Sequence, residues 1–178
     1  MGGKQITCLV SVVCLGLWCG VSILVYERRL HLAAPPHRVF EFHLDPANLR
    51  LLSPGWAAVR RLILPPRIEV GARIEVGVRF LGLLPQRWCV EITRLDPPGI
   101  LVDQAVSGPF PLWRHTHAVT PLEGGGAELL DRVEYRPPGG ILGLWMDRWT
   151  TRVMLGLMFR HRHARTRALL ESEASGTH

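Results

Sequence analysis

The chain has 178 residues, of which 47% are hydrophobic, and a formal net charge of +6. This length suits one folded unit of about 150 residues once an apolar N-terminal segment is set aside. The charge favours an anionic partner, such as a membrane surface or nucleic acid, although arginine-rich codon usage gives the same balance. Three of the four cysteines lie in the apolar segment and only Cys89 lies beyond it. The remaining domain therefore has no internal disulfide framework.

An uncharged apolar run begins at Ile6 and ends at Tyr26. As a helix that rises 1.5 Å per residue, it would span a bilayer core of roughly 30 Å. A cleaved signal peptide is the alternative, but the run is longer than a usual signal core and no small-x-small cleavage site precedes the charged flank. We expect residues 1–27 to be a single-pass membrane anchor. Arg28, Arg29 and Arg38 favour a domain on the cytoplasmic side.

The next elements follow from hydrophobic spacing and proline positions. Residues 28–33 predict a short strand, and residues 36–43 and 45–52 predict two short helices, the second with Asp45 as N-cap. Alternation between apolar and charged residues predicts strands at 72–80 and 87–95, joined as a hairpin. Further strands are expected at 100–106, 112–120 and 127–136. The three glycines 124–126 suit a hairpin loop.

The C-terminal part is predicted to be helical. Residues 141–170 lack proline, and apolar side chains recur at every fourth position: Trp145, Trp149, Val153 and Leu157. A second membrane span is excluded by three charged residues that interrupt the run: Asp147, Arg148 and Arg152. We expect one long helix to residue 170 and a disordered tail over residues 171–178. The folded domain is thus expected at residues 28–170.

The order of elements and three sequence stretches resemble a known superfamily. VDQAVSGPFPLWRHTHAV, LLDRVEYRPPGG and MFRHR are similar to bacterial SRPBCC proteins with a GPF..W.H.H pattern, relatives of START domains, polyketide cyclases and the birch-pollen-allergen family. The matching positions are Asp103, Gln104, Gly108, Pro109, Phe110, Trp113, His115, His117, Asp131 and Tyr135. The resemblance implies an α+β helix-grip fold, in which a curved antiparallel sheet wraps around a long C-terminal helix. It also implies an apolar cavity between sheet and helix, of the kind that holds lipids, quinones, sterols or polyketides.

Strand alternation directs a group of polar side chains toward this cavity. His115 and His117 share a face with Trp113, and Asp131 shares a face with Tyr135 on the next strand. Pairing through the glycine hairpin predicts His117 opposite Asp131 and Trp113 opposite Tyr135. The group has three possible roles. It is a satisfied structural network, a polar anchor for a ligand head group, or a catalytic site with a His–Asp base and a tyrosine acid.

These patterns predict a membrane-anchored binder of a lipid or other apolar small molecule. The expected ligand-binding residues are Trp88, Phe110, Trp113, His115, His117, Tyr135, Trp145, Trp149 and Val153. The first alternative is a cyclase, dehydratase or hydrolase that uses His115, His117, Asp131 and Tyr135. The second is a protein-interaction module that uses the arginine-rich residues 160–167, which otherwise form a solvated face or contact anionic lipids.

We expect no cofactor and no metal site. The His-x-His pair could bind a metal, but the sequence offers only Asp131 as a guess for the third ligand. Sequence-specific nucleic-acid binding is not expected either, because no strand interleaves aromatic and basic residues.

Overall fold

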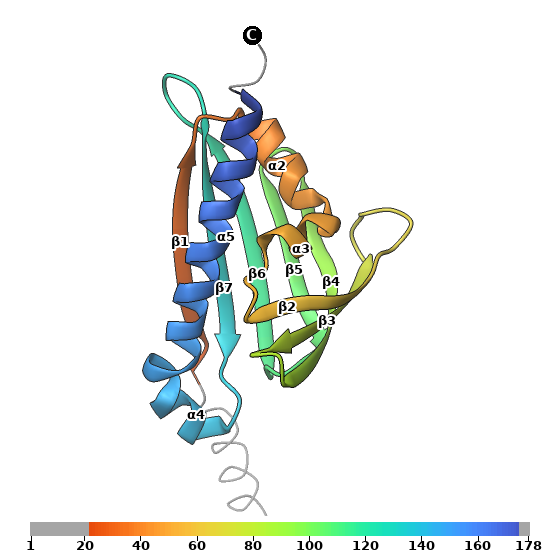
Figure 1. The fold of residues 1–178 in the computed structure, drawn as a ribbon, viewed down its shortest axis with the longest axis vertical. Helices are drawn as coiled ribbons and strands as arrows, with labels where there is room; N and C mark the ends of the chain where they lie inside the picture. Colours follow the sequence, from red (N-terminus) through yellow and green to blue (C-terminus); the bar gives the residue numbers. More distant parts are fainter. Residues whose placement is uncertain (1–21, 175–178) are drawn as a thin grey trace, which may run out of the picture.

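The computed structural model describes residues 22–174, which form an antiparallel sheet and several helices (Figure 1). The strands are β1 (Leu24–Leu32), β2 (Ala57–Ile63), β3 (Arg73–Phe80), β4 (Leu84–Asp96), β5 (Ile100–Ser107), β6 (Leu112–Pro121) and β7 (Ala127–Arg136). The helices are α2 (Pro36–Leu44), η1 (Pro46–Asn48), α3 (Leu49–Leu52), α4 (Gly140–Met146), η2 (Asp147–Trp149) and α5 (Thr151–Ala174). The strand order of the seven-stranded sheet is β1-β7-β6-β5-β4-β3-β2. Strands β3 to β7 follow the prediction closely, β1 begins four residues earlier than predicted, and β2 was not predicted.

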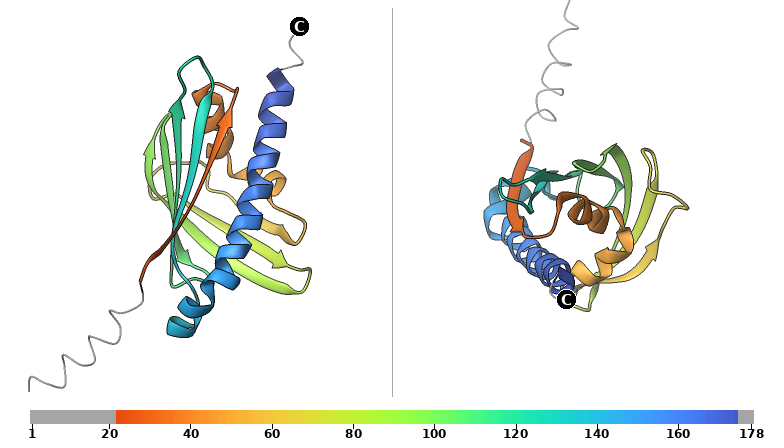
Figure 2. Two further views of the ribbon diagram at one scale, coloured as in Figure 1. Left: turned by 90° about the vertical axis from the view of Figure 1, so that its left-hand side faces the viewer. Right: turned by 90° about the horizontal axis from the view of Figure 1, so that it is seen from above.

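The sheet curves around the helices. Seen from above in Figure 2, it forms an arc that encloses α2 and α3, and α5 lies across the open side of the arc. Strand alternation explains why one face turns inward, since β7 alternates between buried and half-exposed side chains along its whole length. The resulting architecture is the expected α+β helix-grip arrangement.

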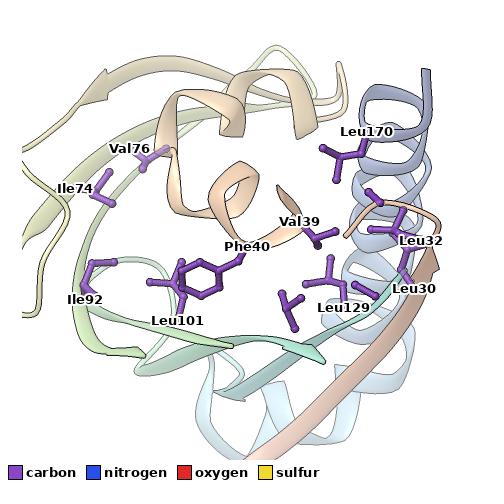
Figure 3. Packing of buried hydrophobic residues seen from close by; sticks show 13 residues of the cluster. Leu30, Leu32, Val39, Phe40, Ile74, Val76, Ile92, Leu101, Leu129 and Leu170 are labelled. Atoms are coloured by element: carbon purple, nitrogen blue, oxygen red, sulfur yellow. The ribbon is translucent and has the colours of Figure 1, made fainter. Parts of the chain in front are cut away.

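The main core lies between α2 and the concave face of the sheet. Val39 and Phe40 of α2 are buried against Leu101 and Leu129 of the sheet, and Leu170 of α5 closes the cluster (Figure 3). Pro36 begins α2 at a position where its missing N–H is not needed. Burial of these apolar side chains, at about 25 cal/mol per Å² of apolar surface, stabilises the packing of α2 against the sheet.

The predicted membrane anchor is wrong over its last residues. Leu24, Val25 and Tyr26 belong to β1, which pairs with β7, and the Tyr26 ring stacks on Phe159 of α5 with ring centroids 5.5 Å apart. These branched and aromatic residues suit an edge strand as well as a membrane helix. Residues 6–21 of the predicted anchor lie outside the described residues. Within residues 22–174, no helix is long and apolar enough to cross a membrane.

The C-terminal region also differs from the prediction. The expected single helix is divided into α4, η2 and α5, and Thr150 between them has a non-helical backbone (φ −115°, ψ −86°). The division follows from Asp147, which turns inward to accept a hydrogen bond from the Tyr135 hydroxyl at 3.0 Å. Helix α5 continues to Ala174, so residues 171–174 are helical and not part of a disordered tail. Residues 175–178 lie outside the described part.

Candidate functional site

A cavity of ≈ 190 Å³ lies between the concave face of the sheet, helices α2 and α3, and helix α5. The inward faces predicted for the strands at 72–80 and 87–95 both line it, on β3 and β4 respectively. From these strands come Ile74, Val76, Val78, Phe80, Trp88, Val90 and Ile92. The walls are therefore largely aliphatic and aromatic, as a pocket for an apolar molecule requires.

Three aromatic rings pack together at one part of the wall. The Trp88 and Trp113 centroids lie 5.1 Å apart, and Phe110 lies 5.6 Å from Trp88 and 5.1 Å from Trp113. Gly108 allows this packing, because a Cβ there would lie 3.0 Å from Cε3 of Trp88. The GPF stretch thus combines a glycine that gives room to one ring with a phenylalanine that packs on it.

The polar end of the cavity is built around Asp131, whose exposed fraction is 2%. As predicted, His117 faces Asp131 in the β6–β7 register and Trp113 faces Tyr135. Asp131 accepts hydrogen bonds from His115 Nε2 at 3.0 Å and from His163 Nε2 of α5 at 2.6 Å. His117 Nδ1 also lies 2.7 Å from Asp131 Oδ1, although its ring is turned away from hydrogen-bond geometry. One buried carboxylate thus holds three histidines from two elements.

These contacts determine the charge of Asp131. Burial raises the pKa of this carboxyl, but the nearby charge of His117 and the hydrogen bonds from His115 and His163 outweigh burial. The pKa of Asp131 therefore lies well below its usual range, and the group is ionised at neutral pH. Burial lowers the pKa of His117 in turn, and the neighbouring His115 lowers it further.

Three further polar groups meet at the same end, and sequence reasoning did not assign them to the site. Asp103 of β5 faces His115 in the β5–β6 register, and burial raises its pKa to about 6. The His43 ring of α2 lies 5.3 Å from the His117 ring, and burial lowers its pKa to about 4. Arg162 of α5 lines the cavity, and its buried Nε has no hydrogen-bond partner among the described residues.

The helical spacing of Arg162 could have identified it as a cavity residue. Met154, Met158 and Arg162 are four residues apart and share one face of α5, and all three line the cavity. Arg162 was instead grouped with the solvated arginines, whereas it is partly buried and only the other three, Arg160, Arg165 and Arg167, are exposed.

The predicted ligand-binding residues divide into two groups. Five of them line the cavity: Trp88, Phe110, Trp113, His115 and His117. The other four do not. Tyr135 is fully buried and bonds Asp147, away from the histidines. Three others, on α4, η2 and α5, are solvent-exposed: Trp145 (76%), Trp149 (69%) and Val153 (48%).

The fold and this cavity define a protein of the SRPBCC superfamily, in which a curved antiparallel sheet grips a C-terminal helix. Residues 32–158 match the family described as "Polyketide cyclase / dehydrase and lipid transport". The match covers well over half of the chain, and the chain belongs to this family. No sequence among the curated proteins matches it.

Solved structures share the fold at low sequence identity. A protein from Chromobacterium violaceum has a TM-score of 0.65 at 19% identity, over 83% of this chain and 97% of that one. The di-domain ARO/CYC StfQ from the steffimycin biosynthetic pathway has a TM-score of 0.70 at 14% identity, over 86% of this chain and 52% of that one. Ara h 8.0201 has a TM-score of 0.58 at 12% identity, over 82% and 98%. At these identities the similarity concerns the fold.

Proposed function

We propose that this protein binds a small apolar molecule with one polar end, at a membrane surface. The observation that carries the proposal is a cavity whose walls are apolar except at one end, where His115, His117, Asp103 and Arg162 meet. Such a division places the apolar part of a ligand against β3 and β4 and its polar group at the histidines. Membership of a cyclase, dehydrase and lipid-transport family supports the same class of ligand.

The cavity volume limits the size of the ligand. An apolar cavity of about 150 Å³ holds one benzene ring, and ligand pockets for drug-sized molecules start at about 300 Å³. The ≈ 190 Å³ available here suits a molecule of one or two rings, or the end of a single acyl chain. A phospholipid with two chains would require α5 to move away from the sheet.

The first experiment identifies the ligand by native mass spectrometry of the full-length protein, followed by solvent extraction. Val78→Trp should fill the cavity, because Val78 lines it on β3, and should abolish co-purification of an apolar molecule. The matched control is Val106→Trp, since Val106 is exposed and lies outside the cavity lining. An equal amount of ligand on both variants, or none on the unmodified protein, would contradict the proposal.

The membrane part of the proposal rests on exposed apolar side chains at one end of the molecule. Helices α4 and η2 lie at the end where β1 begins (Figure 1), and Arg152 Nη1 donates to the Val25 carbonyl oxygen at 3.5 Å. The exposed residues there are Ile23, Val25, Ile141, Leu142, Trp145, Met146 and Trp149. Monomeric proteins rarely expose such a group without a partner surface.

A bilayer is the partner that fits this apolar end. Tryptophans sit at membrane interfaces, and Arg148, whose guanidinium lies 4.6 Å from the Trp149 ring centroid, can reach anionic head groups. The uncharged residues 6–23 precede β1 at this same end, and a span there would bring α4 against the bilayer. We therefore retain the single-pass anchor, with the domain on the cytoplasmic side, as part of the proposal.

Tryptophan depth in vesicles tests the membrane contact. In vesicles of phosphatidylcholine and phosphatidylglycerol with brominated chains, the full-length protein should show quenched tryptophan fluorescence. In a Trp18→Phe background, which removes the tryptophan of the proposed span, Trp145→Ser with Trp149→Ser should remove most of this quenching, whereas Val70→Ser, an exposed apolar site on the β2–β3 loop, should not. Quenching that is unchanged in the double variant would place the apolar end away from the bilayer.

An enzyme remains the second candidate, because His117 lies on the cavity wall with Nδ1 2.7 Å from an ionised carboxylate. This pairing is what a general base of a cyclase or dehydratase needs. His117→Ala should then abolish turnover of a β-keto substrate while ligand uptake persists. Turnover that is unchanged in this variant would exclude the role.

A further inference from the structure

Two buried carboxylates flank the histidine pair of β6. Asp131 of β7 contacts His115 Nε2 and His117 Nδ1. Asp103 of β5 faces the other nitrogen of each ring: its Oδ2 lies 3.7 Å from His115 Nδ1 and 4.0 Å from His117 Nε2. One donor atom from each of Asp103, His115 and His117 lies within 4.8 Å of the others. The three groups therefore converge on one point at the cavity wall.

The contacts with Asp131 determine which nitrogens carry protons. A carboxylate accepts hydrogen bonds, so His115 presents its Nε2–H to Asp131, and a proton on His117 Nδ1, which lies 2.7 Å from Oδ1, would face the same carboxylate. In these tautomers the opposite nitrogens, His115 Nδ1 and His117 Nε2, carry lone pairs on the side of Asp103. Two imidazole nitrogens and a carboxylate oxygen therefore converge on one point. Electron-pair donors in this arrangement attract a cation.

We propose that Asp103, His115 and His117 bind a divalent transition-metal ion of the zinc or iron(II) type. Bonds of about 2.0–2.2 Å in a tetrahedral site place ligand atoms about 3.4 Å apart. The Asp103–histidine separations of 3.7 and 4.0 Å exceed this value by about 0.3 and 0.6 Å, and all three donor atoms lie within 4.8 Å of one another. Two histidines and one carboxylate are a common donor set for such ions.

Asp131 then has a defined role beside the metal. Metal-binding histidines usually donate their second N–H to a carboxylate, which fixes the ring orientation and makes the ligand nitrogen more basic. Asp131 is placed to do this for both ligands, and His163 Nε2 donates to its other oxygen. Asp131 is therefore a positioning residue and not the third ligand that the sequence suggested.

The local charge and the cavity agree with a bound cation. Two carboxylates, Asp103 and Asp131, and the Arg162 guanidinium surround the histidines, and the net negative charge of these groups favours a bound cation. All three ligands line the cavity, which leaves the remaining coordination positions facing it. A carbonyl, enolate or carboxylate oxygen of the bound apolar molecule can occupy such a position. The proposal of a metal site does not depend on the size of the apolar ligand or on contact with a membrane.

Metal titration of the full-length protein tests the proposal. After treatment with EDTA, the protein should bind one Zn²⁺ in competition with a chromophoric chelator, and one Co²⁺ with the intense visible absorption of a tetrahedral site. Asp103→Asn and His117→Gln should each weaken Zn²⁺ binding at least 100-fold. Asp131→Asn should weaken it 10- to 100-fold and shift the Co²⁺ spectrum. His31→Gln, at an exposed histidine paired with Glu128, is the control and should leave affinity unchanged.

The outcomes separate a built site from adventitious binding. Thermal melting in EDTA verifies that each variant is folded, and the near-isosteric Asn and Gln replacements are chosen for this reason. Zn²⁺ affinity that is unchanged in folded Asp103→Asn and His117→Gln, or that is lost only in His31→Gln, overturns the proposal. Uptake of the apolar molecule is measured separately in EDTA, so a failure of the proposed function would be seen independently of metal binding.

Discussion

Asp103 makes the folded protein less stable at neutral pH, and this effect can be measured. Its side chain is only 16% exposed, and burial raises its pKa from the ordinary 3.8 to about 6. A carboxyl whose pKa is higher in the folded state favours the protonated form there. Its stabilising contribution is therefore fully present below about pH 3.8 and is lost as the pH rises through about 6.

The size of the effect follows from the two pKa values. The difference between 3.8 and about 6 corresponds to on the order of 3 kcal/mol at 1.36 kcal/mol per pKa unit. Of this, about 2 kcal/mol lies between pH 4.5 and pH 8. Asp103→Asn resembles the protonated group and lacks the titration. Relative to the unmodified protein, the variant should therefore become more stable by about 2 kcal/mol across that range.

Urea unfolding of the full-length protein in EDTA, followed by tryptophan fluorescence at several pH values, gives this difference. Comparing the two proteins at each pH cancels the contributions of titratable groups that do not interact with Asp103, and the remaining difference includes its coupling to His117 and Asp131. Asp96→Asn is the control, because Asp96 is an exposed aspartate on β4 that pairs with Arg94 at the surface. If the stability difference does not change between pH 4.5 and pH 8, burial of the ionised Asp103 carboxylate does not lower the free energy of unfolding, and the reasoning is refuted.

Four further substitutions test the structure by urea unfolding and ligand uptake. Tyr135→Phe removes the hydroxyl that donates to buried Asp147 at 3.0 Å, and should cost about 1.5–3 kcal/mol while ligand uptake is unchanged. A loss of uptake at unchanged stability would return Tyr135 to the ligand site. Gly126→Ala should destabilise by well over 1 kcal/mol, since φ is +83° and a Cβ would lie 2.3 Å from the Leu32 carbonyl oxygen. Gly124→Ala, with φ +87° and open space, should cost less, and equal costs would contradict the close contact. Gly108→Ala should displace Trp88, whose Cε3 lies 3.0 Å from the new Cβ, and weaken uptake; unchanged uptake would place the ligand away from this ring.

Strand periodicity predicted most of the sheet, because a period of two is a local property of the sequence. The register that pairs His117 with Asp131 followed from the glycine hairpin in the same way. Helix α5 was harder to predict, since its cavity face is set by tertiary packing. The prediction chose the tryptophans as the inward face, whereas Met154, Met158 and Arg162 face the cavity. The Tyr135–Asp147 hydrogen bond, which joins residues on different elements, divides the helix and turns the tryptophans outward.

Asp103 was missed for a related reason. Its strand was predicted, but which aspartates reach the histidines depends on strand order, and β5 lies on the opposite side of β6 from β7. Motif reading found the histidines and one carboxylate partner, because those residues are joined by a short hairpin. The second carboxylate comes from a strand whose pairing with β6 the sequence did not indicate.

The two carboxylates of the site differ in their surroundings, and this difference assigns a structural role to one and a binding role to the other. Asp131 and Asp103 flank the same histidines, yet the pKa of Asp131 is held far below its usual range and that of Asp103 is raised to about 6. Asp131 accepts two hydrogen bonds from histidines, and within residues 22–174 Asp103 has only contacts of 3.7 Å or longer with them. A carboxylate whose partners satisfy it stabilises the fold by itself. The Asp103 carboxylate has no such hydrogen bonds from the histidines, so its lone pairs remain available to a group that enters the cavity, which agrees with the proposed binding of a cation or a polar ligand group there.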